Sequence, residues 1–289
     1  MTYNLADMLT YARPHGSRQE RLFIAKYIKP LGARRDGYGN LILRIGEPRV
    51  LWSAHTDTVH IKGKRQQVDI SKDGRIASTK ENNGALGGDD TAGVYILCKL
   101  ASAGVPGLYI WHRDEEAGAN GSEWIAKNTP ELLDGIDYAI AFDRYGYDSI
   151  VTHQTFRTAS DTFADALAAA LPSLSMAADP TGIFTDTLSY AKLIPECTNI
   201  SVGYECAHTH RESQDLQFPD AIIRAFANVD FDTIPVTRDP SVTEYDSWGD
   251  EGDISDWSDL LEAIASDVVQ AADLLWERGV RAEDLEVTV

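Results

Sequence analysis

The stretch LWSAHTDTVH, residues 51–60, joins an apolar run to a group of polar side chains, and the rest of the chain can be placed around it. The run Val50–Trp52 has the length and flanks of a buried strand. Side chains two positions apart on an extended segment point to the same side, so we expect His55 and Asp57 to be neighbours. A carboxylate beside an imidazole is the arrangement that supports metal-ligating histidines. Alone, the stretch still favours a strand-end histidine hydrogen-bonded to an aspartate over a metal site.

The composition is that of a soluble globular protein. With 289 residues, 43% of them hydrophobic and 25% charged, the chain can form one large domain or two small ones. A net charge of −19 argues against a nucleic-acid partner, because phosphate contacts need a basic face. No run approaches the ~18 apolar residues of a membrane span, and the N-terminal segment lacks the features of a signal peptide. Three cysteines without a CxxC pair are typical of a reducing compartment, so we expect a cytoplasmic protein with no membrane partner.

Short strands alternate with helices over most of the chain. The predicted strands cover residues 40–45, 49–54, 107–112, 136–142, 149–155 and 198–203, and the predicted helices cover residues 5–11, 17–28, 94–103, 122–127, 160–171 and 187–192. The first two strands are predicted to form an antiparallel pair joined by Gly46-Glu47-Pro48, and residues 62–78 a hairpin that turns at Asp73-Gly74. The alternation indicates an α/β three-layer sandwich, with a central mixed, mostly parallel sheet and helices on both faces.

Several predicted strands end in acidic or imidazole residues, and open α/β sheets bind their ligands at the carboxyl ends of strands. The candidates for chemistry are His55, Asp57, Asp89, Asp90, Glu115, Glu116, Asp143 and His208. Imidazole nitrogens and carboxylate oxygens are the ligands of catalytic zinc. One histidine with one or two carboxylates per ion would hold a pair of ions ~3.5–4 Å apart if one carboxylate bridges them. A further carboxylate would be needed to take a proton from the attacking water, and the set has carboxylates to spare.

Five motifs stand in an order that is known from one group of enzymes. They are HTD at 55–57, GGDDTAG at 87–93, DEEAG at 114–118, AFD at 141–143 and GYECAHTHRE at 203–212. From about His55 to Glu212 the chain resembles the co-catalytic dinuclear zinc exopeptidase superfamily, which includes peptidase T-like, carboxypeptidase G-like and aminopeptidase S-like enzymes. The resemblance implies a phosphorylase/hydrolase-like zinc peptidase fold. The intervals from Asp57 to Asp89 and from Asp143 to His208 are too short for an inserted domain, so the chain is similar to the lidless, aminopeptidase-type branch.

The resemblance also implies a role for each matching residue. Five ligands would hold two Zn²⁺ ions, for which Co²⁺ or Mn²⁺ could substitute: His55, Asp89, Asp143, Glu116 and His208. In this set Asp89 would bridge the ions, His55 and Asp143 would complete one ion's ligands, and the other two residues would complete the second ion's ligands. Asp57 would support His55, and Glu115 would be the general base. The order of the motifs does not decide which of the two adjacent glutamates is the base.

These roles imply a zinc-dependent metallopeptidase of aminopeptidase type that hydrolyses short peptides by means of a metal-bridged water. One alternative is an amidohydrolase or carboxypeptidase that acts on N-acylated amino acids, because the same site would cleave any amide that reaches it. A second alternative is a non-catalytic binding module of the same fold. The complete set of ligands together with Glu115 argues against that module.

Other residues are given plainer interpretations. Asp90 is expected to cap the helix that follows it rather than to bind metal, and the AHT context favours His208 over His210. The remaining histidines are interpreted as ordinary polar residues, with the last of them a minor candidate for lining the pocket: His15, His60, His112 and His153. Asp186 is equally compatible with a helix N-cap and with a place beside the site. Arg144 and Arg157 are interpreted as solvated rather than as anchors for a substrate carboxylate.

The composition changes after Phe226. We expect a catalytic domain over residues 1–230, an acidic linker over 231–256 and an amphipathic helix over 257–278. The apolar stripe of that helix should dock on the back of the catalytic domain or on a sister subunit. Docking on a sister subunit would make the protein a homo-oligomer. Docking at the rim of the site is the less favoured alternative.

Overall fold

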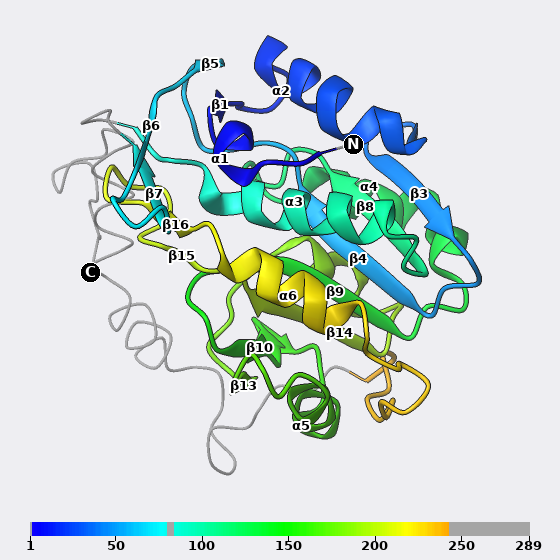
Figure 1. Ribbon diagram of the computed structural model, residues 1–289. Helices are drawn as coiled ribbons and strands as arrows, with labels where there is room; N and C mark the ends of the chain where they lie inside the picture. The colour runs from blue at the N-terminus through cyan, green and yellow to red at the C-terminus, as the bar shows by residue number, and fades with distance from the viewer. Residues whose placement is uncertain (1, 80–83, 243–289) are drawn as a thin grey trace, which may run out of the picture. The chain divides into compact units, whose positions relative to one another are not determined.

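The computed structural model describes residues 2–79 and 84–242 (Figure 1). The strands of its central sheet are, in chain order, β2 (Arg34–Arg35), β3 (Leu41–Ile45), β4 (Val50–His55), β8 (Gly107–His112), β9 (Tyr138–Arg144), β10 (Ser149–Val151), β13 (Ala177–Asp179) and β14 (Glu196–Ser201). Their order across the sheet is β13-β10-β14-β9-β4-β8-β3-β2. From β14 through β9 and β4 to β8 the neighbours are parallel, whereas β10, β3 and β2 join antiparallel. The predicted mixed, mostly parallel sheet is thus confirmed.

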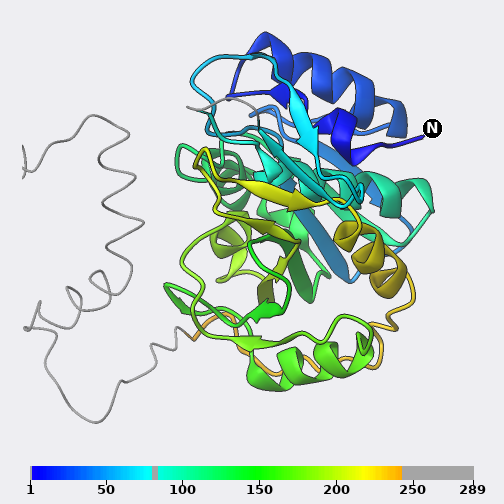
Figure 2. The same ribbon diagram turned by 60° about the vertical axis from the view of Figure 1, so that its left-hand side comes forward.

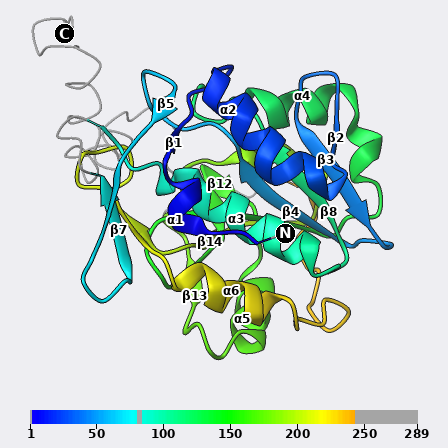
Figure 3. The same cartoon turned by 45° about the horizontal axis from the view of Figure 1, so that its top comes forward.

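The helices cover both faces of this sheet. They are α1 (Leu5–Met8), α2 (Arg18–Phe23), α3 (Gly88–Ser102), α4 (Asn120–Asn128), α5 (Asp161–Ala170) and α6 (Phe218–Phe226), with shorter helical turns at Ile24–Ile28, Lys29–Leu31, Pro130–Leu133 and Asp186–Tyr190. Along β4, Trp52 and Ala54 face an apolar core shared with α3 and α6, which lie side by side (Figure 1), and α1 packs beside α3 (Figure 3). Leu51 faces a second core, shared with α4 and the Asp186–Tyr190 turn. Alternate side chains of β4 thus point into cores on opposite faces of the sheet. Each core is covered by helices, so the structure has the predicted three layers.

A smaller sheet lies beside the main one. Its strands are β6 (Val68–Ile70), β7 (Ile76–Thr79), β15 (Tyr204–Glu205) and β16 (Ser213–Asp215), in the order β15-β16-β7-β6. The predicted hairpin is confirmed as β6–β7, and β7 and β16, far apart in the sequence, run side by side (Figure 2). Two further antiparallel pairs are β1 (Tyr11–Ala12) with β5 (Lys64–Arg65), and β11 (His153–Gln154) with β12 (Phe156–Arg157).

The predicted pairing of the first two strands is wrong. β3 pairs antiparallel with β8, and β4 lies parallel between β8 and β9. All six residues of β4 are buried, whereas β3 is only partly buried. A strand that is apolar on both faces belongs in the middle of a parallel sheet, so β8 comes between the two strands despite their short connection.

The domain extends past the predicted boundary at residue 230. Ile234 is buried, the backbone N–H of Thr237 donates to Glu196 Oε1 at 2.9 Å, and the buried Arg238 donates to the carbonyl of Ile194 at 2.7 Å. Residues 231–242, assigned to the linker from the sequence, thus belong to the domain. The rest of the linker and the amphipathic helix at 257–278 lie outside the described residues. Within residues 2–79 and 84–242, no helix combines the length and apolarity needed to cross a membrane.

Candidate metal centre

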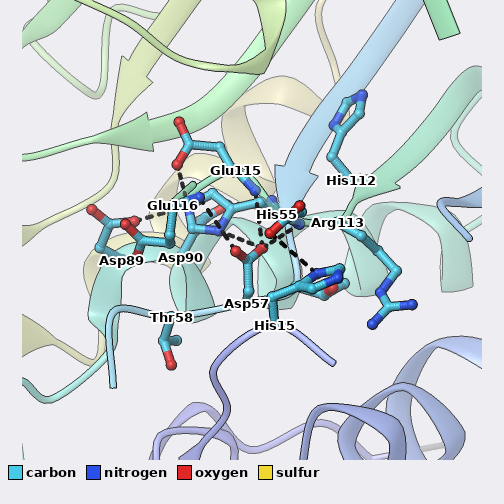
Figure 4. Close-up of polar contacts among 12 residues, drawn as sticks. His15, His55, Asp57, Thr58, Asp89, Asp90, His112, Arg113, Glu115 and Glu116 are labelled. Atoms are coloured by element: carbon cyan, nitrogen blue, oxygen red, sulfur yellow. Dashed lines mark hydrogen bonds and ion pairs between the residues drawn. The ribbon is translucent and has the colours of Figure 1, made fainter. Parts of the chain in front are cut away.

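The candidate residues meet at the carboxyl ends of the parallel strands. His55 is the last residue of β4, Glu115 and Glu116 follow β8, and Asp143 lies near the end of β9. Asp89 is at the start of α3, and the chain after β15 brings in His208. Figure 4 shows how the side chains from β4, from the start of α3 and from the segment after β8 converge. The side chains converge because β4, β8 and β9 are parallel, so that the carboxyl ends of these strands lie at one edge of the sheet.

Two triads of ligand atoms share one carboxylate. His55, Asp89 and Asp143 form the first triad, Asp89, Glu116 and His208 form the second, and the ligand atoms of each triad lie within 4.8 Å of one another. The Oδ1 atom of Asp89 lies 2.9 Å from His55 Nε2, and its Oδ2 atom lies 3.0 Å from His208 Nε2. Asp143 Oδ1 is 3.6 Å from His55 Nε2, and Glu116 Oε2 is 3.3 Å from His208 Nε2. The structure thus brings together the five residues selected from the sequence, with Asp89 between the two halves.

The charges of this cluster fit a site for cations. Asp143 Oδ1 and Glu116 Oε1 are buried and have no hydrogen-bond partner among the described residues. Burial raises the pKa of Asp143 to about 7, and the neighbouring Asp89 carboxylate adds to the effect. Burial opposes the protonation of His208, but the Asp89 and Glu116 carboxylates outweigh it and raise the pKa of this imidazole to about 12. Crowded carboxylates with unpartnered oxygens need compensating charge, and two imidazoles with three carboxylates are a donor set that suits zinc.

The two adjacent glutamates occupy different places. Glu116 belongs to the second triad, whereas Glu115 belongs to neither triad, and its Oε2 lies 3.9 Å from His55 Nε2. Glu115 is buried, and burial raises its pKa well above the usual range, with the charges of Asp143, Asp186 and Glu116 in support. Glu115 therefore lies beside the two triads without belonging to either.

Asp57 holds the glutamate pair more closely than it holds His55. Its Oδ1 accepts the backbone N–H groups of Asp114 at 3.0 Å and Glu115 at 3.3 Å, and its Oδ2 accepts that of Glu116 at 3.3 Å. Its separation from His55 Nδ1 is 3.6 Å, which is longer than a hydrogen bond. The sequence predicted only the contact with His55, because a backbone contact between distant segments has no local signal.

Asp90 caps the regular part of α3, as predicted, because the backbone of Asp89 and Asp90 inside the range of α3 is not helical. Its Oδ1 accepts the N–H of Gly93 at 2.8 Å, and its Oδ2 accepts the N–H of His55 at 3.1 Å. At Gly93 the backbone of α3 passes close to Asp90 and to the backbone of β9. Only glycine fits there, because an added Cβ would lie 2.3 Å from the carbonyl oxygen of Phe142. Asp90 therefore positions His55 as well as starting the helix.

Several supporting residues were missed from the sequence. Thr185 Oγ1 donates to Asp143 Oδ2 at 2.8 Å, and Asn199 exchanges two hydrogen bonds with the backbone of Asp143. The fully buried Arg13 donates to the carbonyl of Thr56 and to Thr91 Oγ1, both at 2.7 Å, and so links the segments that carry His55 and Asp89. A lone arginine, threonine or asparagine gives no pattern that would reveal such a role.

The other histidines fall outside the triads. His210 is exposed, whereas His208 is in the second triad. His60 is buried and forms hydrogen bonds with Thr58, Gln66 and the carbonyl of Ala85. His112 forms hydrogen bonds with Ser53 and Tyr190. His15 lies beside Asp57 (Figure 4), and its Nδ1 is 3.6 Å from Asp114 Oδ1, but the oxygens of Asp57 are already engaged by backbone N–H groups.

Two further expectations are refined. Asp186 is not an N-cap, because Thr185 holds that position; its carboxylate is buried, 3.3 Å from His112 Nδ1. Burial raises the pKa of Asp186 to about 7, with the charges of Asp57 and Asp143 contributing. Arg144 was expected to be solvated, but its side chain is only 12% exposed and pairs with Asp179 at 3.1 Å.

Comparisons with known proteins identify the fold. No family model matches the sequence, and no curated protein matches it. A tripeptidase from Staphylococcus aureus subsp. aureus Mu50 matches at a TM-score of 0.63 and 14% identity, over 78% of this chain and 95% of that chain. Aminopeptidase PepT from Bacillus cereus ATCC 10987 matches at 0.62 and 14%, over 77% and 95%. The TET1 peptidase of Pyrococcus horikoshii, which can assemble into a tetrahedron or a large octahedral shell, matches at 0.54 and 16%, over 74% and 94%. The chain therefore has the fold of these peptidases.

Proposed function

We propose that the protein is a dinuclear zinc metallopeptidase of aminopeptidase type that hydrolyses short peptides. The observation that carries the proposal is the pair of triads that share Asp89, with Glu115 beside them and outside both. The likeness to a tripeptidase and an aminopeptidase supports the choice of substrate. We also propose a cytoplasmic homo-oligomer, since the similar TET1 peptidase assembles into large shells.

The ligands of the two ions would be those of the two triads. Bound divalent ions would polarise the scissile carbonyl and lower the pKa of water. The Glu115 carboxylate takes the proton of the attacking water and then delivers it to the amine that leaves. Asp57 fixes the backbone of both glutamates, so that one side chain stays with His208 while the other stays free to carry the proton.

We expect the protein to bind two divalent ions per chain, with zinc preferred, and to release p-nitroaniline from amino-acid p-nitroanilides only when it is loaded. Ions that bind the folded state alone must also raise the melting temperature. Metal analysis, thermal unfolding and the activity assay, each with and without a chelator, test the proposal. Fewer than one equivalent after zinc reconstitution, with no thermal shift, would refute the metal centre. Cleavage of N-acylated amino acids in place of the p-nitroanilides would point to the amidohydrolase alternative.

A further inference from the structure

A buried carboxyl group outside the ligand set accepts hydrogen bonds from the backbone of the segment that carries Asp89. Glu212 is 1% exposed, and its two oxygens accept four successive backbone N–H groups. Oε2 accepts those of Leu86 at 2.8 Å and Gly87 at 3.0 Å, and Oε1 accepts those of Gly88 at 2.6 Å and Asp89 at 3.2 Å. Four hydrogen bonds from successive backbone N–H groups to one buried carboxyl group fix the backbone of residues 86–89.

The segment is shaped to receive this carboxylate. Gly87 has a φ of +77°, in the left-handed region that glycine adopts without strain. An added Cβ at Gly88 would lie 3.1 Å from both Glu212 Oε1 and Tyr204 Cβ. The two glycines therefore allow the backbone to approach Glu212 closely enough for all four hydrogen bonds.

Glu212 also lies on the loop that carries His208. Its backbone N–H donates to the carbonyl of Thr209 at 3.1 Å, and the N–H of Arg211 donates to Thr209 Oγ1 at 3.1 Å, so the stretch between the two residues is closed on itself. The same glutamate thus connects the loop of one imidazole ligand with the segment of the shared carboxylate. His208 Nε2 and Asp89 Oδ2 are 3.0 Å apart across this connection.

We propose that Glu212 is a positioning residue of the metal centre, which holds Asp89 beside His208 so that both side chains could bind the same ion. The inference rests on the proposed metal centre. Asp89 belongs to both triads, so its displacement would affect both ions, and the second triad most, because His208 moves with the same loop. Residues that orient metal ligands typically contribute about 10–100-fold in metal affinity.

A matched control separates this role from plain stabilisation. Glu196 is also a fully buried glutamate whose oxygens accept backbone N–H groups, those of Ser160 at 2.7 Å, Thr237 at 2.9 Å and Arg238 at 3.1 Å. It begins β14 and so lies at the opposite end of the sheet from the triads. Glu196→Gln should therefore lower the thermal stability as Glu212→Gln does, and leave metal binding alone.

The test titrates the metal-free wild type, Glu212→Gln and Glu196→Gln with Co²⁺, by calorimetry and by the absorption spectrum of the bound ion. We expect Glu212→Gln to lose about 10–100-fold in affinity for at least one ion, with a changed spectrum, and Glu196→Gln to match the wild type. If Glu212→Gln does not fold, Glu212→Asp, which keeps the charge but withdraws it by one methylene, should show the same loss. If the folded Glu212 variant binds Co²⁺ with the affinity and the spectrum of the wild type, the inference about Glu212 is wrong, but the proposed metal centre stands. A wild type that binds no Co²⁺ overturns the proposed metal centre, and the inference falls with it.

Discussion

Glu115→Gln should lower kcat by about 10²–10⁴-fold and leave both metal sites filled. This is the usual share of general acid–base catalysis, and glutamine keeps the shape of the side chain while losing the ability to take a proton. Glu115 lies in neither triad, so its loss should not weaken metal binding. Kinetics on a p-nitroanilide and metal analysis of the same preparation check both halves of the prediction.

Glu116→Gln is the matched control, because the two residues are adjacent and Asp57 holds the backbone of both. Its Oε2 is 3.3 Å from His208 Nε2, so this substitution should release the ion of the second triad. The two variants should thus both be inactive but differ in metal content. Loss of metal from Glu115→Gln, with retention by Glu116→Gln, would reverse the roles within the pair.

Part of the site has a local signal in the sequence, whereas the choice of the five ligands among the eight candidates came from the resemblance to the zinc exopeptidases. His55 closes an apolar strand, Asp143 lies near the end of another, and the two glutamates come shortly after a third. A polar residue at the end of a buried strand is visible in the sequence, and parallel strands bring such ends to one edge. The pattern that predicts the fold therefore also predicts that the strand-end residues meet, whereas Asp89 and His208 have no such signal and were assigned through the motifs that contain them.

The supporting contacts could not be predicted in this way. Glu212 and Asp89 are 123 positions apart, and Glu212 acts through backbone N–H groups that any residue type supplies. Arg13 likewise bonds to the carbonyl of Thr56 across 43 positions. The wrong pairing of β3 with β4 has a related cause, since a short connection favours a hairpin and only the burial of the whole strand shows that β8 must come between them.

Asp143→Asn should lower the affinity for an ion in the first triad by more than about 100-fold, yet stabilise the metal-free protein at high pH. Burial and the Asp89 carboxylate raise the pKa of Asp143 to about 7 in the folded protein, far above the value of about 3.9 that an unfolded chain shows. A carboxyl group with a raised folded pKa costs stability once it must ionise, so the cost grows from about pH 4 and is complete above about pH 7. Asparagine removes this charge and keeps an oxygen that can accept from Thr185.

At pH 8 we therefore expect metal-free Asp143→Asn to have a higher free energy of unfolding and a higher melting temperature than the wild type, and to lose this gain near pH 4. With zinc the order should reverse, because the wild type binds both ions and therefore gains more stabilisation than the variant, which has lost affinity in the first triad. Asp186→Asn is the control: the pKa of this buried carboxyl is also raised to about 7, and the neighbouring His112 adds no charge, since burial lowers its pKa to about 3. It should stabilise the metal-free protein in the same way and keep the affinity for both ions, because Asp186 is in neither triad. If metal-free Asp143→Asn is less stable than the wild type at pH 8, ionisation of this buried carboxyl group does not destabilise the folded protein, and the prediction is wrong.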